Sequence, residues 1–204
     1  MTLFKDKPLS QLFDEAKKRT EASVRYQVEN EFSSFPKEKL VEIFMLDEKI
    51  NHLEINLDDR TSSVDMIPIP AENFKNTFDV TRGEKYLCAR VKYTYNKPKK
   101  YNLLNYWPKG IAFNKNVEFN VTSDKLNIYY QTRYMNENLS DEIKREVKSF
   151  MIDLHEEIKE LVQIMNQEID VFNAELKNEV EVWIDNRIAK KEKSDNQNSD
   201  LNDF

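Results

Sequence analysis

Glycine is almost absent from this chain. Among 204 residues, Gly83 and Gly110 are the only two, and they lie far apart in the sequence. A nucleotide-binding loop needs clustered glycines, because their backbone N–H groups must come close to the phosphates. The scarcity of glycine therefore excludes the phosphate-binding loops of nucleotide and dinucleotide enzymes.

Cysteine and histidine are equally scarce. The single cysteine, Cys88, excludes an internal disulfide framework and any multi-cysteine zinc site. With only His52 and His155 present, carboxylates would have to supply most ligands of a histidine-containing metal site. We therefore expect no metal and no cofactor, and we interpret Cys88 as a small core residue.

Long apolar runs are also missing. No stretch of about 18 apolar residues occurs, so the sequence predicts no membrane-spanning helix. The first eight residues are charged and amphipathic and do not open an apolar run, which is not the pattern of a signal peptide. We expect a cytoplasmic protein without membrane contact.

Charge is abundant where these features are lacking. The chain is 33% charged and 39% hydrophobic, with a formal net charge of -6. Such a composition supports a modest core but not a large compact globule, and it is too apolar for complete disorder. It predicts a small domain with a long, charged helical part. High Asn, Lys, Glu and Ile usage is typical of an AT-rich bacterial or phage genome.

The N-terminal segment from about residue 8 to 47 has helical periodicity. Pro36 interrupts the pattern and suits the start of a second helix. Both helices are amphipathic and should pack on a sheet or on each other. Their apolar positions are Leu9, Leu12, Phe13, Ala16, Val24, Val28 and Phe32 in the first helix and Leu40, Val41, Phe44 and Met45 in the second.

The central segment from about residue 50 to 135 alternates as strands do. Strands are predicted at 52–57, 86–95, 117–121 and 126–130, and an edge strand or connection is predicted at the proline-bounded 66–70. Short connections without helical crossovers predict an antiparallel or mixed sheet.

A turn is predicted within this segment. Ser123 and Asp124 separate the last two alternating runs, and both are turn-forming residues. They predict a hairpin between those strands.

From about Ser140 to 191 the sequence predicts one long helix with an apolar repeat of eleven residues. Ser140 is a suitable N-cap, and neither proline nor glycine follows it. Eleven residues in three turns keep the apolar stripe nearly straight along a helix. The stripe consists of Ile143, Val147, Phe150, Leu154, Ile158, Leu161, Met165, Ile169, Phe172, Leu176, Val180 and Trp183.

Something must cover this stripe. The N-terminal helices, the same helix of a second copy, or a different protein could do so, and a break near 165–173 could instead fold the segment into a hairpin. Asn173 interrupts a flanking apolar column. It could set the register between helices or lie solvated at the rim of the stripe.

Taken together, the pattern predicts an α+β fold. An α+β domain spans 1–139, a long amphipathic helix for assembly or partner binding spans 140–191, and a disordered acidic tail spans 192–204. The helix sequence has the character of a coiled coil.

Basic residues are concentrated between 82 and 115. Nine basic residues and one acid give this segment a charge of +8, which leaves -14 for the rest of the chain. Aromatic residues lie among them, and this combination suits single-stranded nucleic acid or another polyanion. Lysines that protect strand edges give the same pattern. The residues that would bind are Arg90, Lys92, Lys97, Lys99, Lys100, Tyr101 and Trp107.

Evidence for catalysis is weaker. Asp58, Asp59 and Asp65, or Asp79 with Glu84, could be metal ligands of a nuclease, but adjacent aspartates in a polar loop are more often turn residues. No nucleophile lies near a suitable base in the sequence, so no catalytic residue is proposed.

The sequence thus favours an interaction protein without enzymatic activity. We expect a bacterial or phage subunit, adaptor or inhibitor that assembles through the stripe of its long helix, as a homo-oligomer or with a protein partner. The alternative is nucleic-acid or polyanion binding by segment 82–115, and the third hypothesis is a metal-dependent nuclease.

Overall fold

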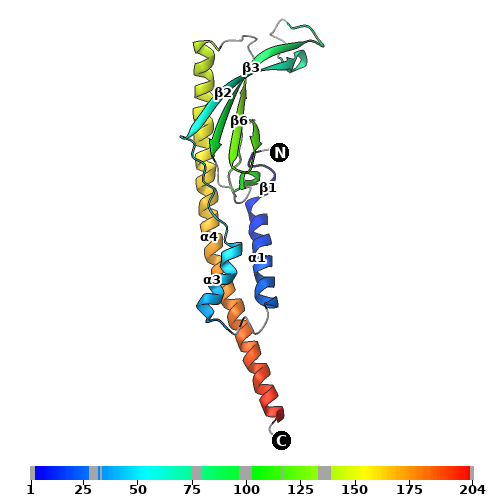
Figure 1. Cartoon of the computed structure of the whole chain (residues 1–204), viewed down its shortest axis with the longest axis vertical. Coiled ribbons are helices and arrows are strands. Elements are labelled where there is room, and N and C mark those ends of the chain that lie inside the picture. The colour runs from blue at the N-terminus through cyan, green and yellow to red at the C-terminus, as the bar shows by residue number, and fades with distance from the viewer. Residues whose placement is uncertain are drawn as a thin grey trace. The chain divides into compact units, whose positions relative to one another are not determined.

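A computed structural model of the chain describes residues 3–27, 32, 34–74, 80–96, 103–115, 117–132 and 139–202, with the side chains of 200–202 excepted. Figure 1 shows the arrangement of the elements. In chain order they are β1 (Lys7–Pro8), α1 (Leu9–Tyr26), α3 (Lys37–Glu48), β2 (Arg60–Pro70), η1 (Ala71–Asn73), β3 (Lys85–Asn96), η2 (Leu103–Asn105), β4 (Tyr106–Trp107), β5 (Glu118–Val121), β6 (Lys125–Gln131) and α4 (Asp141–Asn202).

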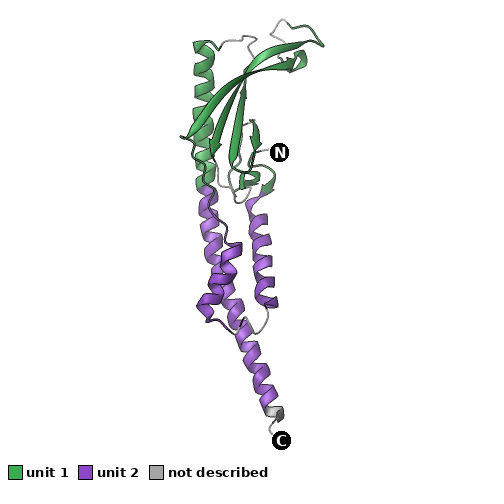
Figure 2. Ribbon diagram, viewed as in Figure 1, with its two compact units in different colours: residues 1–7, 53–163 green, residues 8–52, 164–204 purple. Residues whose placement is uncertain are grey.

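The elements form two compact units that share helix α4 (Figure 2). Unit 1 contains residues 1–7 and 53–163, which include the sheet and the first part of α4. Unit 2 contains residues 8–52 and 164–204, which include α1, α3 and the rest of α4. The sequence placed a boundary at 139/140, whereas each compact unit includes a part of the long helix.

Unit 1 is built on a four-stranded antiparallel sheet with the order β2-β3-β6-β5. The predicted α+β class and the antiparallel sheet are thereby confirmed. The hairpin at Ser123 and Asp124 is also confirmed, because β5 and β6 pair directly across it. A separate two-stranded sheet joins β1 to β4.

Strand β2 is an edge strand, as its two prolines predict. It begins at Arg60, before the predicted start at residue 66. The side chains of its first six residues are exposed, so this part has no apolar alternation that sequence analysis could detect.

The strand predicted at 52–57 is wrong. No strand forms there; instead the Asn56 Oδ1 accepts hydrogen bonds from the backbone N–H groups of Asp58 and Asp59, at 3.1 and 3.2 Å, and closes a turn. Leu53 and Leu57 are buried, at 5% exposure each. The alternation therefore records burial of the side chains and not pairing with another strand.

Unit 2 is a bundle of α1, α3 and part of α4. Buried apolar residues recur along one face of α1, as the sequence predicts, and Pro36 is the N-cap of α3. On α3 the buried residues are Leu40, Val41 and Phe44. Helix α1 thus contacts the apolar stripe of α4, and α3 contacts both α1 and α4 within the same chain.

Helix α4 is continuous from Asp141 to Asn202, which confirms one helix and not a hairpin. Ser140 is its N-cap, since the Ser140 Oγ accepts the Ile143 N–H at 3.3 Å. The sequence predicted an end near 191, but the helix extends further because no proline or glycine ends it. The side chains of 192–199 are all exposed.

Within the described residues, no helix contains a segment of the length and apolarity needed to cross a bilayer.

Candidate interaction surface

The apolar stripe of α4 lies in the core of this chain. Ten of its twelve side chains are buried, and Phe150 and Trp183 are half-buried. The part before residue 164 belongs to the core of unit 1, and the part after it belongs to the core of unit 2. The stripe that the sequence assigned to a partner is therefore covered by the chain itself.

In unit 1 the sheet covers the stripe with tyrosines. The Tyr95 hydroxyl shares a hydrogen bond of 2.7 Å with the His155 Nε2, and Tyr95 is completely buried. The Tyr130 hydroxyl donates to the Glu146 carboxylate at 2.6 Å. The Tyr130 ring packs edge-on against the Phe150 ring, with the two ring centroids 4.9 Å apart. Each tyrosine thus combines apolar contact with a satisfied polar end.

The hydrogen-bonded pair of Tyr95 and His155 is buried, and burial shifts the pKa of both side chains. Burial lowers the pKa of His155, and the nearby Arg60 and Lys159 lower it further. Burial also raises the pKa of Tyr95 above its usual value. Both shifts favour the neutral forms of the side chains, because burial disfavours charge.

In unit 2, α1 covers the stripe with aromatic and charged contacts. The rings of Phe13 and Phe172 stack with their centroids 4.4 Å apart. The Lys17 ammonium pairs with the Glu179 carboxylate at 2.5 Å. The apolar contact is central and the ion pair lies at its more exposed margin.

Asn173 holds the segment that follows α3. Its Oδ1 accepts the Ile50 N–H at 3.1 Å, and its Nδ2 donates to the Ile50 carbonyl at 2.8 Å. One turn earlier on α4, the Asp170 carboxylate meets the His52 Nε2 at 2.8 Å. Asn173 is therefore a specific clamp and not a solvated residue at the rim, and it fixes the position of this segment along α4.

Arg187 closes the other end of the bundle. It donates to the carbonyls of Val24 and Gln27, both at 2.5 Å, and its guanidinium lies 4.0 Å from the centre of the Phe32 ring. The carbonyls at a helix C-terminus lack intrahelical donors. Arg187 supplies these donors to α1.

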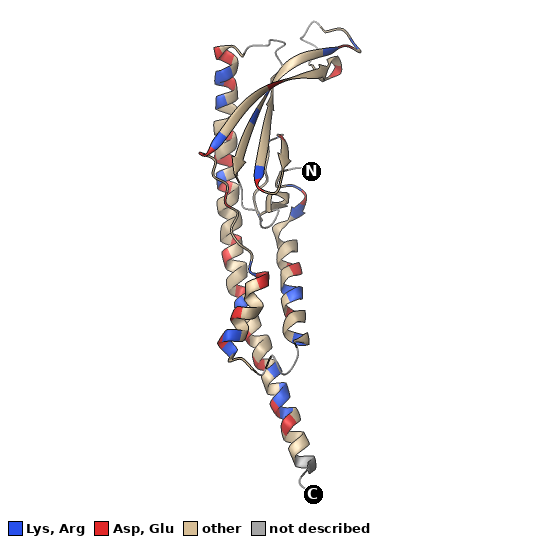
Figure 3. Ribbon diagram, viewed as in Figure 1, with Lys and Arg blue, Asp and Glu red and all other residues tan. Residues whose placement is uncertain are grey.

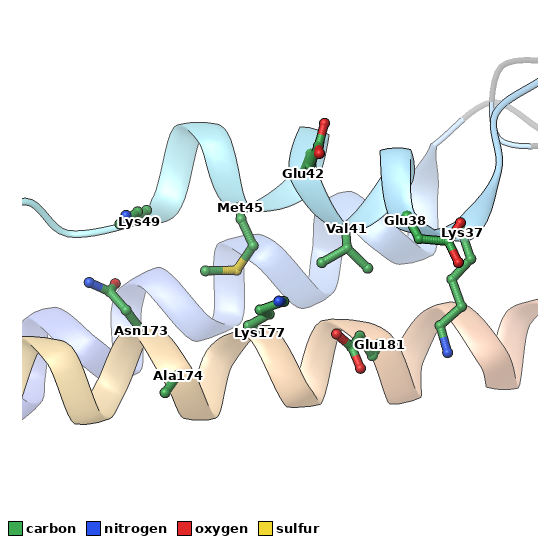
Figure 4. A pocket seen from close by; sticks show the side chains of 10 residues that line it. All are labelled: Lys37, Glu38, Val41, Glu42, Met45, Lys49, Asn173, Ala174, Lys177 and Glu181. Carbon is green, nitrogen blue, oxygen red and sulfur yellow. The ribbon is translucent and has the colours of Figure 1, made fainter.

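A groove of about 630 Å³ remains open between α3 and α4 in unit 2 (Figure 4). Val41, Met45 and Ala174 form its apolar floor. The other lining residues are polar or charged, namely Lys37, Glu38, Glu42, Lys49, Asn173, Lys177 and Glu181. An apolar floor with a charged rim is typical of a surface that takes a protein segment.

Exposed apolar side chains lie near this groove and elsewhere on the helices. Leu46 of α3 is 80% exposed. On α4, Val171 and Val182 are 58% and 56% exposed, and Ile152 is 61% exposed. These residues lie outside the eleven-residue stripe. No pattern within α3 or α4 alone shows that the two helices leave a gap, so the sequence does not indicate the groove.

The basic segment is only partly brought together by the described residues. Arg90 and Lys92 lie on the sheet face opposite the one that carries Tyr95, and the Arg90 guanidinium is occupied by the Glu118 carboxylate at 2.7 Å and the Tyr129 ring at 3.8 Å. Trp107 lies in β4, which pairs with β1 in the other sheet. Lys97, Lys99, Lys100 and Tyr101 lie outside the described residues.

Two of the carboxylates considered as metal ligands belong to a turn. Asp58 and Asp59 lie in the turn that Asn56 closes, and the Asp59 carboxylate accepts a hydrogen bond from the Asn96 amide at 3.0 Å. Within the part of the chain that the structure describes, no three His, Cys, Asp or Glu residues gather in a way that could hold a metal ion. Asp79 lies outside that part. Cys88 is a fully buried core residue, as predicted, and burial raises the pKa of its thiol.

Charges of both signs are distributed over both units (Figure 3). Comparison with known proteins found no match to a family model, to a curated protein or to a solved structure.

Proposed function

We propose that the chain is an interaction protein without enzymatic activity, which assembles with a second copy through its long C-terminal helix. The groove between α3 and α4 is the observation that carries the proposal. Its floor is apolar and includes Val41, which is also part of the buried core of unit 2, while its rim is charged. We interpret this open groove on a folded bundle as a surface for another protein.

The surface that we propose differs from the one that the sequence suggested. The stripe from Ile143 to Trp183 is the chain's own core, so a partner that bound it would have to displace the sheet or the helices. A partner can contact the outer faces of α4 without displacing the sheet or the helices. The assembly surface of α4 therefore consists of side chains outside the stripe, beginning with those that line the groove.

From composition we place the protein among the cytoplasmic subunits, adaptors or inhibitors of bacterial or phage multi-gene systems. The buried free thiol of Cys88 is compatible with a reducing compartment.

Co-expression of two differently tagged copies tests the proposal. Capture of one tag should retain the other copy through a wash at about 0.5 M salt, where the Debye length is only a few ångströms. An unrelated protein with the second tag is the control. Self-assembly is contradicted if the second copy is lost in the wash to the same extent as the control protein, even when the wash is made at low salt.

A second candidate function, polyanion binding, has one favourable observation. Arg90, Lys92 and Tyr129 lie together on the polar face of the sheet. Charge and an aromatic ring at one place suit single-stranded nucleic acid. This function predicts affinity for a labelled oligonucleotide that falls steeply with salt and is lost on Lys92→Glu, whereas Lys18→Glu on α1 leaves it unchanged. Affinity insensitive to salt, or equal loss in both variants, would contradict it.

A further inference from the structure

We propose that the groove between α3 and α4 binds the same groove of a second copy, with the two copies antiparallel about a twofold axis. The inference rests on the proposed self-assembly and specifies its surface and geometry. It is carried by the order of charges along the groove, which is complementary to itself.

The charges that line the groove are separated by sign along its length. Toward the start of α3 lie Glu38, Glu42 and, on α4, Glu181 (Figure 4). Toward the end of α3 lie Lys49 and, on α4, Lys177. The groove therefore has an acidic end and a basic end. Two such grooves placed antiparallel bring each acidic end against the basic end of the other copy.

The remaining basic residue, Lys37, lies at the acidic end of the groove. Its ammonium pairs with the Asp185 carboxylate at 2.7 Å, and that contact, together with the nearby carboxylates of Glu181 and Glu38, raises the pKa of Lys37. Within the acidic end, Glu42 is paired with Lys39 of its own helix at 2.9 Å. Lys37 and Glu42 are therefore already paired within the chain, and only the other lining charges could pair with a second copy.

Four lining charges form no ion pair within the described residues, although Glu38 and Glu181 lie near the Lys37 ammonium. None of the ion pairs in the described part of the chain involves Glu38, Lys49, Lys177 or Glu181. Glu38 and Lys49 are on α3 and its C-cap, and they lie about 16 Å apart at 1.5 Å per residue. They are too distant to pair within one chain, whereas a second copy can pair with both.

These four charges share one centre. The midpoint between Glu38 and Lys49 falls at Ile43 and Phe44, and the midpoint between Lys177 and Glu181 falls at Glu179. The ion pair of Lys37 with Asp185 and the clamp of Ile50 by Asn173 show that α3 runs antiparallel to α4. Interpolation between these two contacts places the two midpoints at nearly the same level.

A single twofold axis at that level therefore satisfies all four charges. Glu38 meets Lys49 of the second copy, Lys177 meets Glu181 of the second copy, and the symmetry repeats each pair. An isologous interface requires this kind of self-complementary order. A partner of unrelated sequence would have no reason to match it.

The same axis brings apolar surface together. Glu42 and Met45 lie on either side of the centre on α3, and Val41 and Ala174 lie in the floor beside them. Leu46 is four residues after Glu42 and three before Lys49, so it borders the mouth of the groove. It is 80% exposed, the largest value among the exposed large hydrophobic side chains. Association would cover it together with the floor.

Charge exchange tests the geometry in the full-length chain by sedimentation equilibrium. Glu38→Lys and Lys49→Glu each replace two attractive pairs by two repulsive ones, so each single variant should raise the dimer dissociation constant about tenfold. The double variant again places opposite charges together, so its dissociation constant should return to near the wild-type value. Lys18→Glu, the same charge change as Lys49→Glu at an exposed position of α1, is the matched control for that variant and should leave the constant unchanged.

The outcomes separate this inference from the function on which it rests. If neither single variant changes the dimer dissociation constant, or if the double variant dissociates as readily as the single variants, the proposed groove interface is contradicted. Self-assembly through another surface would then remain. A wild-type chain that stays monomeric at all concentrations overturns both. Helix content by circular dichroism shows that each variant is folded, and Leu46→Lys gives a second, charge-independent measure that should also weaken the dimer.

Discussion

Asn173 shows how one polar side chain can locate a segment distant in the sequence. Ile50 is 2% exposed, and its backbone N–H and carbonyl are both bonded by the Asn173 amide. Buried backbone groups need partners, because an unsatisfied group keeps its full desolvation cost. The sequence marked Asn173 as an interruption in an apolar column, but its partner is too distant in sequence to be inferred.

We predict that Asn173→Ala lowers the free energy of unfolding by about 1–3 kcal/mol, because the Ile50 groups lose their partners. Asn178→Ala is the matched control, since Asn178 is exposed on the same helix and the change in helix propensity is the same. Urea unfolding of both variants measures the difference. Equal effects would mean that the clamp contributes nothing.

His155 gives unit 1 a pH-dependent stability. Its pKa is lowered in the folded state from 6.5 by burial and by Arg60 and Lys159, while Asp58 and Glu156 act in the opposite direction. The unfolded chain therefore binds a proton more readily than the folded chain. Stability from this group is fully present above pH about 6.5 and is lost as the pH falls through that value toward the lower folded pKa.

We predict that His155→Gln makes the stability of the protein less dependent on pH between about pH 7.5 and 5. Glutamine does not titrate but can still hydrogen-bond to Tyr95. Urea unfolding at a series of pH values gives the slope for each protein. An unchanged slope would show that other groups cause the pH dependence.

At the scale of elements, α4 carries two kinds of apolar position. Ten of the twelve stripe positions are buried, as Leu176 is at 1% exposure, whereas several apolar positions outside the stripe are open, as Val182 is at 56% exposure. Comparing substitutions at a buried and an open position therefore tests directly whether the chain covers its own stripe. Both positions lie in the same part of α4, in unit 2.

We predict that Leu176→Ala destabilises the protein by about 2–5 kcal/mol, the range for a buried leucine. Val182→Ala should change stability by no more than about 0.5 kcal/mol. Thermal and urea unfolding of dilute protein, where association is weakest, supply both values. Similar small losses for the two variants would show that the stripe is not covered within one chain.

The last turns of α4 contribute little packing, since the side chains of 192–199 are exposed. We predict that a chain ending at Lys191 keeps the melting temperature of the full chain within about 2 °C, because exposed positions have small effects on stability. Differential scanning calorimetry measures this. A larger fall would show that these turns are held by contacts outside the described side chains.

Periodic patterns predicted most of these elements. The eleven-residue repeat identified α4 and its buried face, and Pro36 identified the break before α3, because each depends on local geometry. Strand β3 was predicted because it alternates over its whole length. The alternation at Leu53 and Leu57 was misleading, since a buried loop can place its side chains with the same period as a strand.

What local patterns could not show was which surface would cover the stripe. That depends on whether α1, α3 and the sheet return to α4, and no single segment contains this information. The groove was hidden for the same reason. Its charges became informative only when the contacts of Asp185 and Asn173 aligned α3 with α4.

At the scale of the whole molecule, the chain combines a complete core in each unit with an open groove on one of them. A core that needs no partner means that monomers should be folded. Association is then an equilibrium between folded chains and depends on concentration. The central claim is that this equilibrium produces a dimer through the groove.

Light scattering behind size exclusion, across a range of loading concentrations, tests that claim most directly. At low salt and at about 0.5 M salt, we predict a mass that rises with concentration toward twice that of the chain, with a modest shift at high salt because the groove combines an apolar floor with a few exposed charges. A mass equal to one chain at every concentration and at both salts would contradict the account.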